Sequence, residues 1–545
     1  MVPRRRPNVR PVLKPPMQIV YTLDDRLPPL AWVATIPPGC DSLAVRHGAL
    51  VETSTQGFFE GAWAGDFGVW RPDLDEVVFG SGAIIVAGEA CFVSSLATTD
   101  YLFYAVSERE GLRIANSLPL LLAATRDRLD PLFRGYAEVN NTIMLGVERH
   151  ERVIPTRAGS VRRLMTNNLQ VGRDGRPREV AKPMPPHLTT YAAYAAYLRT
   201  SYERLAGNAR DPRRQRPMRI YSTQSRGYDS TAINALAART GVDGVFTVTH
   251  GKVGDFADSK EQRQVSDDGT EIATILGLSP VIPLERRAFE RGFADEVLYH
   301  AGIHECQDAN LKQATEHILA PALLLTGTLG ELWYTRACWP FTQDLYVDNA
   351  FPRGDLGTHG LGEVRLRVGF VQVALPYIGN RRRADVVAVT ESAEMAPWRL
   401  SNRYDRPIPR RLAEEAGVPR ELFGQVKVGS TVEFVPPQIP QDPVLRAEYF
   451  EFLVREGLRR RWQIRLFPMI RRWNRMIWLT TYQRYRAIYY YYRVKVRLRK
   501  DERRTLLWDD LRGSLHCFAV NRCVDMYADA LAGVQAHPTV GGSAS

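Results

Sequence analysis

The stretch that decides the fold reads YSTQSRGYDSTAINALA and covers residues 221–237. Its beginning belongs to MRIYST (218–223), which predicts a buried strand, and STAINALAART (230–240) predicts a helix. Gly241 follows that helix, where a C-terminal glycine cap is expected. The turn between strand and helix aims free backbone N–H groups and the positive end of the helix at one point. It carries Ser225, Gly227, Asp229 and Ser230.

The turn has two interpretations on pattern alone. In the first it binds phosphate: Ser225 and Ser230 donate hydroxyl hydrogen bonds, and Asp229 holds a Mg²⁺ ion that bridges to phosphate oxygens. In the second it only changes the direction of the chain, with Gly227 supplying a positive φ and Asp229 or Ser230 capping the helix. The turn is neither a Walker A loop nor a GxGxxG fingerprint.

Strands and helices alternate along the middle of the chain. VFTVTH (245–250), VIPL (281–284) and ALLLTG (322–327) read as strands, and SDDGTEIATILG (266–277) reads as a helix with Ser266 as N-cap. This alternation predicts a parallel sheet with helices on its faces. Ligands of such sheets bind at the carboxyl ends of the strands. The opening turn lies at such an end, and so does GTLGEL, residues 327–332.

The rest of the chain divides by composition. Residues 1–18 are rich in Pro and Arg and predict a flexible basic arm. Residues 19–185 hold short β-rich runs such as EVVFGSG and GAIIVAG, which predict two sheets packed face to face. The polar, Pro-rich stretch at 172–186 closes this domain. We expect the α/β domain over 186–435 and a helical extension over 436–545.

Composition and cysteine pattern favour a cytoplasmic protein. No signal peptide is evident after the basic first ten residues, and no apolar run approaches the ~18–20 residues of a membrane span. The six cysteines are scattered without a CxxC pair, which argues against a zinc site or a redox dithiol. A length of 545 residues favours two or three domains, and an oligomer is compatible with it.

The positive charge is concentrated in one segment. Residues 455–504 hold 17 Lys and Arg against three acidic residues, an excess of +14 where the whole chain has +12. Aromatic residues are interleaved with these cations. An anionic membrane surface and single-stranded nucleic acid are both candidate partners for such a segment. The third interpretation is a helical subdomain whose arginines lay their stems over its own core.

Several motifs, in the right order, resemble one family. SRGYDS resembles the SGGxDS pyrophosphate loop of the PP-loop ATP pyrophosphatases, with Arg226 in place of the first glycine. TGTLGELW (326–333), DDGTEIATILGL (267–278) and residues 392–427 resemble further segments of the asparagine synthetase-like branch. EGAWAGDF, VFGSG and NSLPLLLA resemble its N-terminal glutaminase-type domain, an Ntn-hydrolase-like sandwich. The resemblance covers most of residues 30–430.

The resemblance implies an ATP-dependent ligase that adenylates a carboxylate, releases pyrophosphate and forms an amide with an amine. It assigns catalysis to Lys427 and Asp229 and metal binding to Asp229 and Glu331, although Gly330 competes with Glu331 for the family's acidic position. ATP and Mg²⁺ are the expected cofactors, and small molecules or peptides supply the acid and the amine. Nucleotide and pyrophosphate binding falls to Ser225, Arg226, Gly227, Asp229, Ser230, Thr249 and Gly327.

Two departures from the family change the expectation. Residue 2 is Val, and Cys40 lies inside the chain, so the N-terminal cysteine nucleophile is missing and we expect no glutamine hydrolysis. Arg226 can bind phosphate but adds bulk to a loop that the family builds on two glycines. These changes leave a catalytically inactive scaffold as the alternative function. A nucleic-acid-modifying PP-loop enzyme is the third, since the basic segment suits such a substrate.

Overall fold

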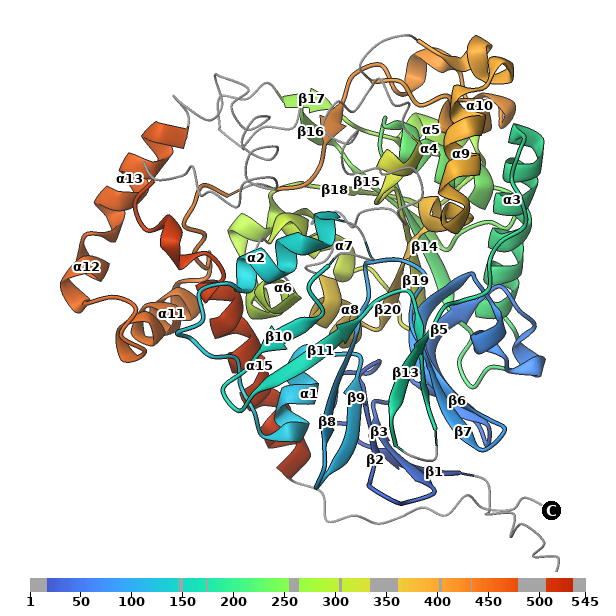
Figure 1. Ribbon diagram of the computed structural model, residues 1–545. Helices are drawn as coiled ribbons and strands as arrows, with labels where there is room; N and C mark the ends of the chain where they lie inside the picture. Colours follow the sequence, from blue (N-terminus) through green and yellow to red (C-terminus); the bar gives the residue numbers. More distant parts are fainter. Residues whose placement is uncertain are drawn as a thin grey trace, which may run out of the picture.

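The computed structural model of the protein describes residues 17–145, 147, 150–172, 175–253, 264–302, 306–333, 361–400, 404–432, 434–478 and 506–532. Nearly all of the predicted arm and residues 479–504 of the basic segment lie outside the described residues. The chain forms a β-rich N-terminal region, a parallel sheet with flanking helices, and a helical C-terminal region (Figure 1). The predicted order of these three regions along the chain is confirmed.

Two sheets packed face to face form the N-terminal region (Figure 1). Trp32 and Leu102 from the first sheet share a core with Phe58 and Phe92 from the second. The first sheet has the order β1-β3-β2-β9-β8-β11-β10 and the second β13-β12-β7-β6-β5-β4. The strands are β1 (Gln18–Leu23), β2 (Trp32–Ile36), β3 (Ser42–His47), β4 (Glu52–Thr53), β5 (Gly57–Trp63), β6 (Val78–Val86), β7 (Glu89–Val93), β8 (Leu102–Ser107), β9 (Gly111–Ala115), β10 (Val153–Pro155), β11 (Ser160–Leu164), β12 (Asn168–Val171) and β13 (Pro177–Val180).

The glycines of strand β6 do not end a strand. The sequence suggested two short runs over residues 76–88, but one strand covers most of them. A Cβ at Gly80 would lie 1.9 Å from the Glu60 carbonyl oxygen, and one at Gly82 would lie 2.0 Å from the Phe58 carbonyl oxygen. These glycines therefore allow β5 to approach closely, which is the other meaning of glycine inside a strand.

A five-stranded parallel sheet forms the middle of the protein, in the order β18-β15-β14-β19-β20. All of its pairings are parallel, and β19 is buried along its whole length, as the apolar run LLL suggests. The strand β20 was not predicted, although its sequence FVQVA is apolar and fully buried. The strands are β14 (Arg219–Gln224), β15 (Gly244–Val248), β18 (Val281–Leu284), β19 (Ala322–Thr326) and β20 (Phe370–Ala374).

Helices pack around this sheet and beyond it (Figure 1). Of the described α-helices that precede the parallel sheet in the sequence, α3 is the longest. Its N-cap is Thr190, whose side chain accepts a hydrogen bond from the Ala193 amide. The described α-helices are α1 (Leu118–Thr125), α2 (Tyr136–Asn141), α3 (Tyr191–Ala209), α4 (Tyr228–Ala237), α5 (Thr270–Ile275), α6 (Glu296–Gly302), α7 (Lys312–Thr315), α8 (Gly362–Val368), α9 (Arg383–Glu391), α10 (Pro407–Glu415), α11 (Pro443–Arg455), α12 (Arg461–Arg465), α13 (Phe467–Ile477) and α15 (Ser514–Ala532).

The predicted start of one helix is wrong. Ser266 does not cap a helix but ends strand β17 (Gln264–Ser266), where it pairs with His250 of β16 (His250–Val253). The helix α5 begins only after Gly269. A small antiparallel sheet, completed by β21 (Val428–Gly429), thus outweighs the local capping signal. Among the described residues, no helix is long and apolar enough to cross a membrane.

The helix α15 returns to the N-terminal region and packs against α1 and α6, which Figure 1 draws beside it. Its buried Asn521 holds Leu129 at both backbone groups: the side-chain oxygen accepts from the Leu129 amide at 2.9 Å, and the side-chain nitrogen donates to the Leu129 carbonyl at 3.0 Å. The end of the chain's helical region is therefore anchored on the first domain.

A buried ion cluster joins the sandwich to the parallel-sheet region. Arg365 of α8 donates to both carboxylate oxygens of Glu60 in β5, at 2.9 and 3.2 Å, and forms an ion pair with Asp100. All three side chains are at most 2 % exposed. Burial raises the pKa of Glu60 and of Asp100, and the guanidinium opposes that effect.

We expect Arg365→Met to destabilise the protein strongly. The substitution leaves two buried carboxylates without their cation, and breaking a buried pair in this way costs about 3–5 kcal/mol. Urea unfolding of the full chain measures the loss. Arg134→Met is the matched control, because Arg134 pairs with Asp510 at an exposed site and should cost less than ~1 kcal/mol. If the two variants lost the same free energy of unfolding, the buried cluster would contribute no more than an exposed ion pair.

Candidate functional site

The turn after β14 lies at the point where the sheet reverses its order. The chain passes from β14 to β15 and β18 on one side, then crosses to β19 and β20 on the other. The turns that follow β14 and β19 therefore leave adjacent strands at the same edge of the sheet (Figure 1). In open parallel sheets this switch point is where ligands bind.

The two serines of the turn bind each other and the backbone. Their hydroxyl oxygens lie 2.8 Å apart, and the Ser225 amide donates to the Ser230 hydroxyl at 3.1 Å. The Gly227 amide donates to the Ser225 hydroxyl, also at 3.1 Å. These bonds hold the turn in a closed ring ahead of α4. The serines are therefore structural parts of the turn as well as candidate phosphate donors.

The plain-turn interpretation loses both of its supports. Gly227 has a φ of −80°, so it does not supply the positive φ that this interpretation requires. Gly227 is itself the N-cap of α4, and the helix has no side-chain cap. Space at Gly227 is limited, because a Cβ there would lie 3.1 Å from the Ser225 hydroxyl oxygen. The N-terminus of α4 therefore has no side-chain cap and lies at the switch point.

Asp229, the predicted catalytic acid and metal ligand, forms an ion pair with Arg406. Arg406 is the residue immediately before α10. Its side chain is fully buried, while the Asp229 side chain is 18 % exposed. Burial pushes the pKa of Arg406 well below its usual range. The guanidinium is thus the cation beside Asp229 in this structure. No feature of the local sequence pointed to Arg406.

The second turn fits tightly against Asp229. A Cβ at Gly327 would lie 3.0 Å from the Asp229 Cβ and 3.1 Å from the Ser230 amide nitrogen. A Cβ at Gly330 would lie only 2.0 Å from the Asp229 carboxylate carbon. Gly330 is therefore the residue that faces Asp229. Glu331 belongs to the 3-10 helix over Gly330–Trp333, and its side chain lies outside the described residues.

Asp267 is a site residue that the prediction missed. Its carboxylate accepts a hydrogen bond from the Arg226 amide at 3.0 Å, although the side chain is almost fully buried. Burial raises the pKa of Asp267 to about 6, against the attraction of Lys427 and Arg226. The acidic start of DDGTEIATILGL was a signal for this carboxylate, because it stands just ahead of α5.

Arg226 turns its side chain away from the ring of hydrogen bonds. Its guanidinium lies 3.7 Å from the Glu271 carboxylate of α5 and is 40 % exposed. Its amide binds Asp267, and its carbonyl accepts from the Gly424 amide at 2.8 Å. The bulk that Arg226 adds to the turn is thus directed toward α5. Its main chain ties the turn to the segment that carries Lys427.

Lys427 reaches the site because β21 pairs with β16 directly after it. Its ammonium nitrogen lies 6.0 Å from the centre of the Tyr404 ring. The Tyr404 ring lies tilted against Tyr228, with ring centres 4.9 Å apart, and the Arg406 guanidinium lies 5.2 Å from the centre of the Tyr404 ring. The resemblance placed Lys427 near the pyrophosphate, and the structure brings it to the same turn.

Thr249 lies at the same edge, one residue after β15. Its carbonyl accepts from the Asp267 amide at 3.1 Å, and its own amide donates to the Leu284 carbonyl at 3.2 Å. Both backbone groups are thus engaged. The side-chain oxygen lies 3.2 Å from the His250 ring nitrogen. Every predicted nucleotide-binding residue therefore belongs to one edge of the sheet.

The described residues do not fit a magnesium site. A Mg²⁺ ion needs several oxygen ligands in an octahedron. The described part of the chain holds no group of three side chains that could ligate a metal, and Asp229 is paired with Arg406. We therefore derive no step through Mg²⁺.

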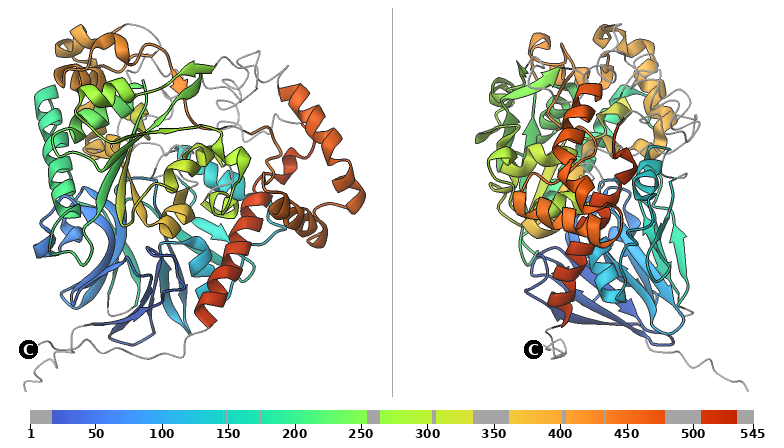
Figure 2. Two further views of the ribbon diagram at one scale, coloured as in Figure 1. Left: turned by 180° about the vertical axis from the view of Figure 1, so that it is seen from behind. Right: turned by 90° about the vertical axis from the view of Figure 1, so that its left-hand side faces the viewer.

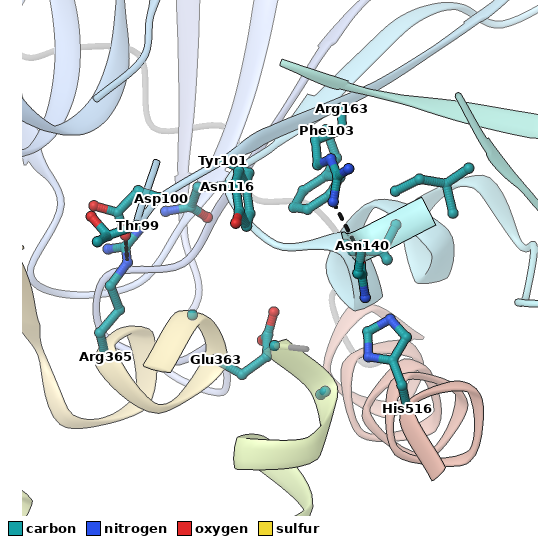
Figure 3. A pocket seen from close by; sticks show the side chains of 15 residues that line it. Thr99, Asp100, Tyr101, Phe103, Asn116, Asn140, Arg163, Glu363, Arg365 and His516 are labelled. Carbon is teal, nitrogen blue, oxygen red and sulfur yellow. Dashed lines mark hydrogen bonds and ion pairs between the residues drawn. The ribbon is translucent and has the colours of Figure 1, made fainter. Parts of the chain in front are cut away.

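A second polar site lies between the sandwich, α8 and α15 (Figure 3). It is a cavity of about 40 Å³, which holds about three water molecules. Asp100 and Arg365 stand at one end, and Asn140, Arg163 and His516 at the other. Among the described residues the Asn140 side-chain nitrogen and the Thr99 hydroxyl find no hydrogen-bond partner. No local pattern predicts this cavity, because its walls come from segments far apart in the sequence.

No protein-family model matches the chain, and no curated protein matches it significantly. The class that fold and site define is an α/β protein with a candidate anion site at the switch point of a parallel sheet.

We expect Gly330→Ala to destabilise the protein. The new Cβ collides with the Asp229 carboxylate and separates it from Arg406, and overpacking of this kind costs about 1–3 kcal/mol. Thermal and urea unfolding measure the change. Gly207→Ala is the control: Gly207 lies in α3 with open space around it, so alanine should be neutral or stabilise by up to ~1 kcal/mol. A Gly330→Ala protein as stable as Gly207→Ala would contradict this geometry.

The raised pKa of Asp267 predicts a pH-dependent stability difference between the wild type and Asp267→Asn. The acid's pKa is about 6 in the folded chain and near 3.8 when unfolded, so its favourable contribution is present below pH 4 and is lost as the pH rises through 6. The free energy of unfolding of the asparagine variant should therefore rise relative to that of the wild type between pH 4 and 7, by on the order of 2 kcal/mol. Urea unfolding across this range tests it. A constant difference would mean that Asp267 titrates normally.

Proposed function

We propose that the protein is an ATP-dependent ligase that adenylates a carboxylate and then joins it to an amine, without hydrolysing glutamine. One observation carries the proposal: the serine turn, Asp267 and Lys427 come from segments far apart in the sequence and meet at the switch point of a parallel sheet. These are the segments whose motifs resemble the asparagine synthetase-like branch of the PP-loop superfamily.

The fold supports the same proposal in a coarser way. A two-sheet sandwich followed by a five-stranded parallel sheet is the order that the resemblance implies. We interpret the sandwich as a glutaminase-type domain without its nucleophile, because Cys40 lies in the turn between β2 and β3 and not at a chain start. The amine then comes from ammonia or from a second substrate.

The charges at the edge suit a polyphosphate. The N-terminus of α4 carries partial positive charge, and Lys427 adds a cation within reach of Asp267. The Arg226 guanidinium pairs with Glu271 in this structure and would have to turn to reach a phosphate. In our proposal the serine turn and Lys427 stabilise the charge that develops on the departing pyrophosphate. Fixed donors at such a position are worth a few kcal/mol each. Arg406 holds Asp229 in place rather than touching the phosphates.

A catalytically inactive relative is the second candidate function. The Asp229–Arg406 ion pair favours it, because the acid that the family uses as a metal ligand is engaged by a buried guanidinium. A scaffold would retain the fold and the anion site but would not release AMP.

We expect a non-hydrolysable ATP analogue to bind the full chain with micromolar affinity in calorimetry. Lys427→Ala should weaken binding at least about tenfold, since a charged contact to phosphate is worth ~1.5–3 kcal/mol. Arg109→Ala is the control, because Arg109 is an exposed cation in the turn between β8 and β9. No binding by the wild type, or equal binding by the two variants, would contradict a nucleotide site at this edge.

A second measurement separates the ligase from the scaffold. The wild type and Lys427→Ala are each incubated with ATP, a panel of carboxylic acids and a panel of amines, with and without EDTA. The AMP that forms is then quantified. AMP that depends on an acid and disappears in Lys427→Ala supports the ligase. Nucleotide binding without AMP formation under any condition favours the scaffold. Activity that survives EDTA would mean that the reaction needs no metal ion.

A further inference from the structure

The helices α12 and α13 carry a surface that the proposed function does not use. They stand at the margin of the molecule, away from both the sandwich and the parallel sheet (Figure 1). When the molecule is turned so that this side faces the viewer, they lie in front of the other elements (Figure 2). Among the described residues, none lies in front of these helices on this side, so a flat partner can reach them.

One face of α13 is fixed against the protein. Asn474 is fully buried: its side-chain nitrogen donates to the Pro436 carbonyl at 2.8 Å and to the Leu507 carbonyl at 2.6 Å. Its side-chain oxygen accepts from the Leu507 amide at 2.7 Å. Phe467, on the same face, packs 5.2 Å from Phe450 between ring centres. These contacts fix which side of the helix points outward.

The outward side carries a strip of large apolar residues. They recur every three or four residues, so at about 100° per residue they fall within a strip about 80° wide. Each side chain is between 42 and 66 % exposed: Trp462, Leu466, Met469, Trp473 and Met476. Single exposed apolar residues are ordinary, but a continuous strip of five marks an interaction surface.

Arginines fill the adjoining sector of the same helices. There is no acidic residue between Gly457 and Ile477, and none of the exposed arginines of this stretch forms an ion pair with a described residue. They are Arg460, Arg461, Arg465, Arg471, Arg472 and Arg475. The outward surface is thus half apolar and half cationic, which suits a partner with an anionic layer above an apolar one.

We propose that α12 and α13 bind the surface of a membrane rich in anionic phospholipid. Trp462, Leu466 and Met469 insert among the acyl chains, and the arginines lie at the level of the phosphates. Helices that lie in the membrane interface have this division of faces, with tryptophan at the boundary. Nucleic acid is a poorer fit, because Leu466, Met469 and Met476 offer no ring on which a base can stack.

The test is sedimentation of the full chain with vesicles. We expect it to bind vesicles of phosphatidylcholine with one third phosphatidylserine at physiological salt, and to bind pure phosphatidylcholine much more weakly. Trp462→Ser/Leu466→Ser/Met469→Ser should lose at least about tenfold in partitioning. Arg471→Gln/Arg472→Gln should lose about thirtyfold on the anionic vesicles, from ~1 kcal/mol for each charge.

The control replaces apolar residues that are equally exposed but lie elsewhere, in Leu132→Ser/Leu319→Ser. It should bind like the wild type, and all variants should retain the wild-type circular dichroism and melting temperature because their sites are exposed. The proposal is overturned if the wild type does not bind anionic vesicles or if the strip variant binds as well as the control. It is also overturned if the chain binds a single-stranded oligonucleotide but no vesicle.

Discussion

The constraint on which the rest of the structure depends is the parallel pairing of β14 with β15 on one side and β19 on the other. Parallel neighbours cannot be joined by a tight turn, so each strand must be followed by a crossover that leaves from the same edge. The turn after β14 and the turn after β19 are therefore neighbours, although about 100 residues separate them. The contact of Gly327 and Gly330 with Asp229 is a direct consequence of that pairing.

The chain relies on carboxylates that are held by donors from distant segments. Arg406 forms an ion pair with Asp229, the Arg226 amide donates to Asp267, and Arg365 joins Glu60 and Asp100 across the boundary with the sandwich. Burying a carboxylate costs desolvation free energy, which such a donor offsets. These pairs specify how the segments fit together more than they add stability. The same logic explains why Arg406, a buried cation, stands where a metal ion was expected.

The sequence predicted what local pattern controls and missed what tertiary contact controls. The strand predicted at 218–223 lies at Arg219–Gln224, and the helix predicted at 230–240 lies at Tyr228–Ala237, as apolar periodicity indicates. Gly241 has a positive φ, but the helix already ends with Ala238 as its C-cap, so the predicted cap is wrong. Ser266 was predicted to cap a helix, but it pairs with His250 in a strand. The prediction failed because the local sequence does not show the partner strand. Arg406 and the cavity beside Asn140 were missed for the same reason. Asp267 belongs to the motif at 267–278. Its role in the site becomes apparent only from its hydrogen bond with the Arg226 amide.

The distribution of arginine gives the last step of the argument. In the body of the protein, buried arginines such as Arg365 and Arg406 each face a carboxylate, so their charge is compensated within the fold. The exposed arginines of α12 and α13 face none among the described residues, and the segment's excess of +14 is larger than that of the whole chain. These exposed cations stand beside an exposed apolar strip, and a lipid surface supplies both an anion for the cations and an apolar phase for the strip.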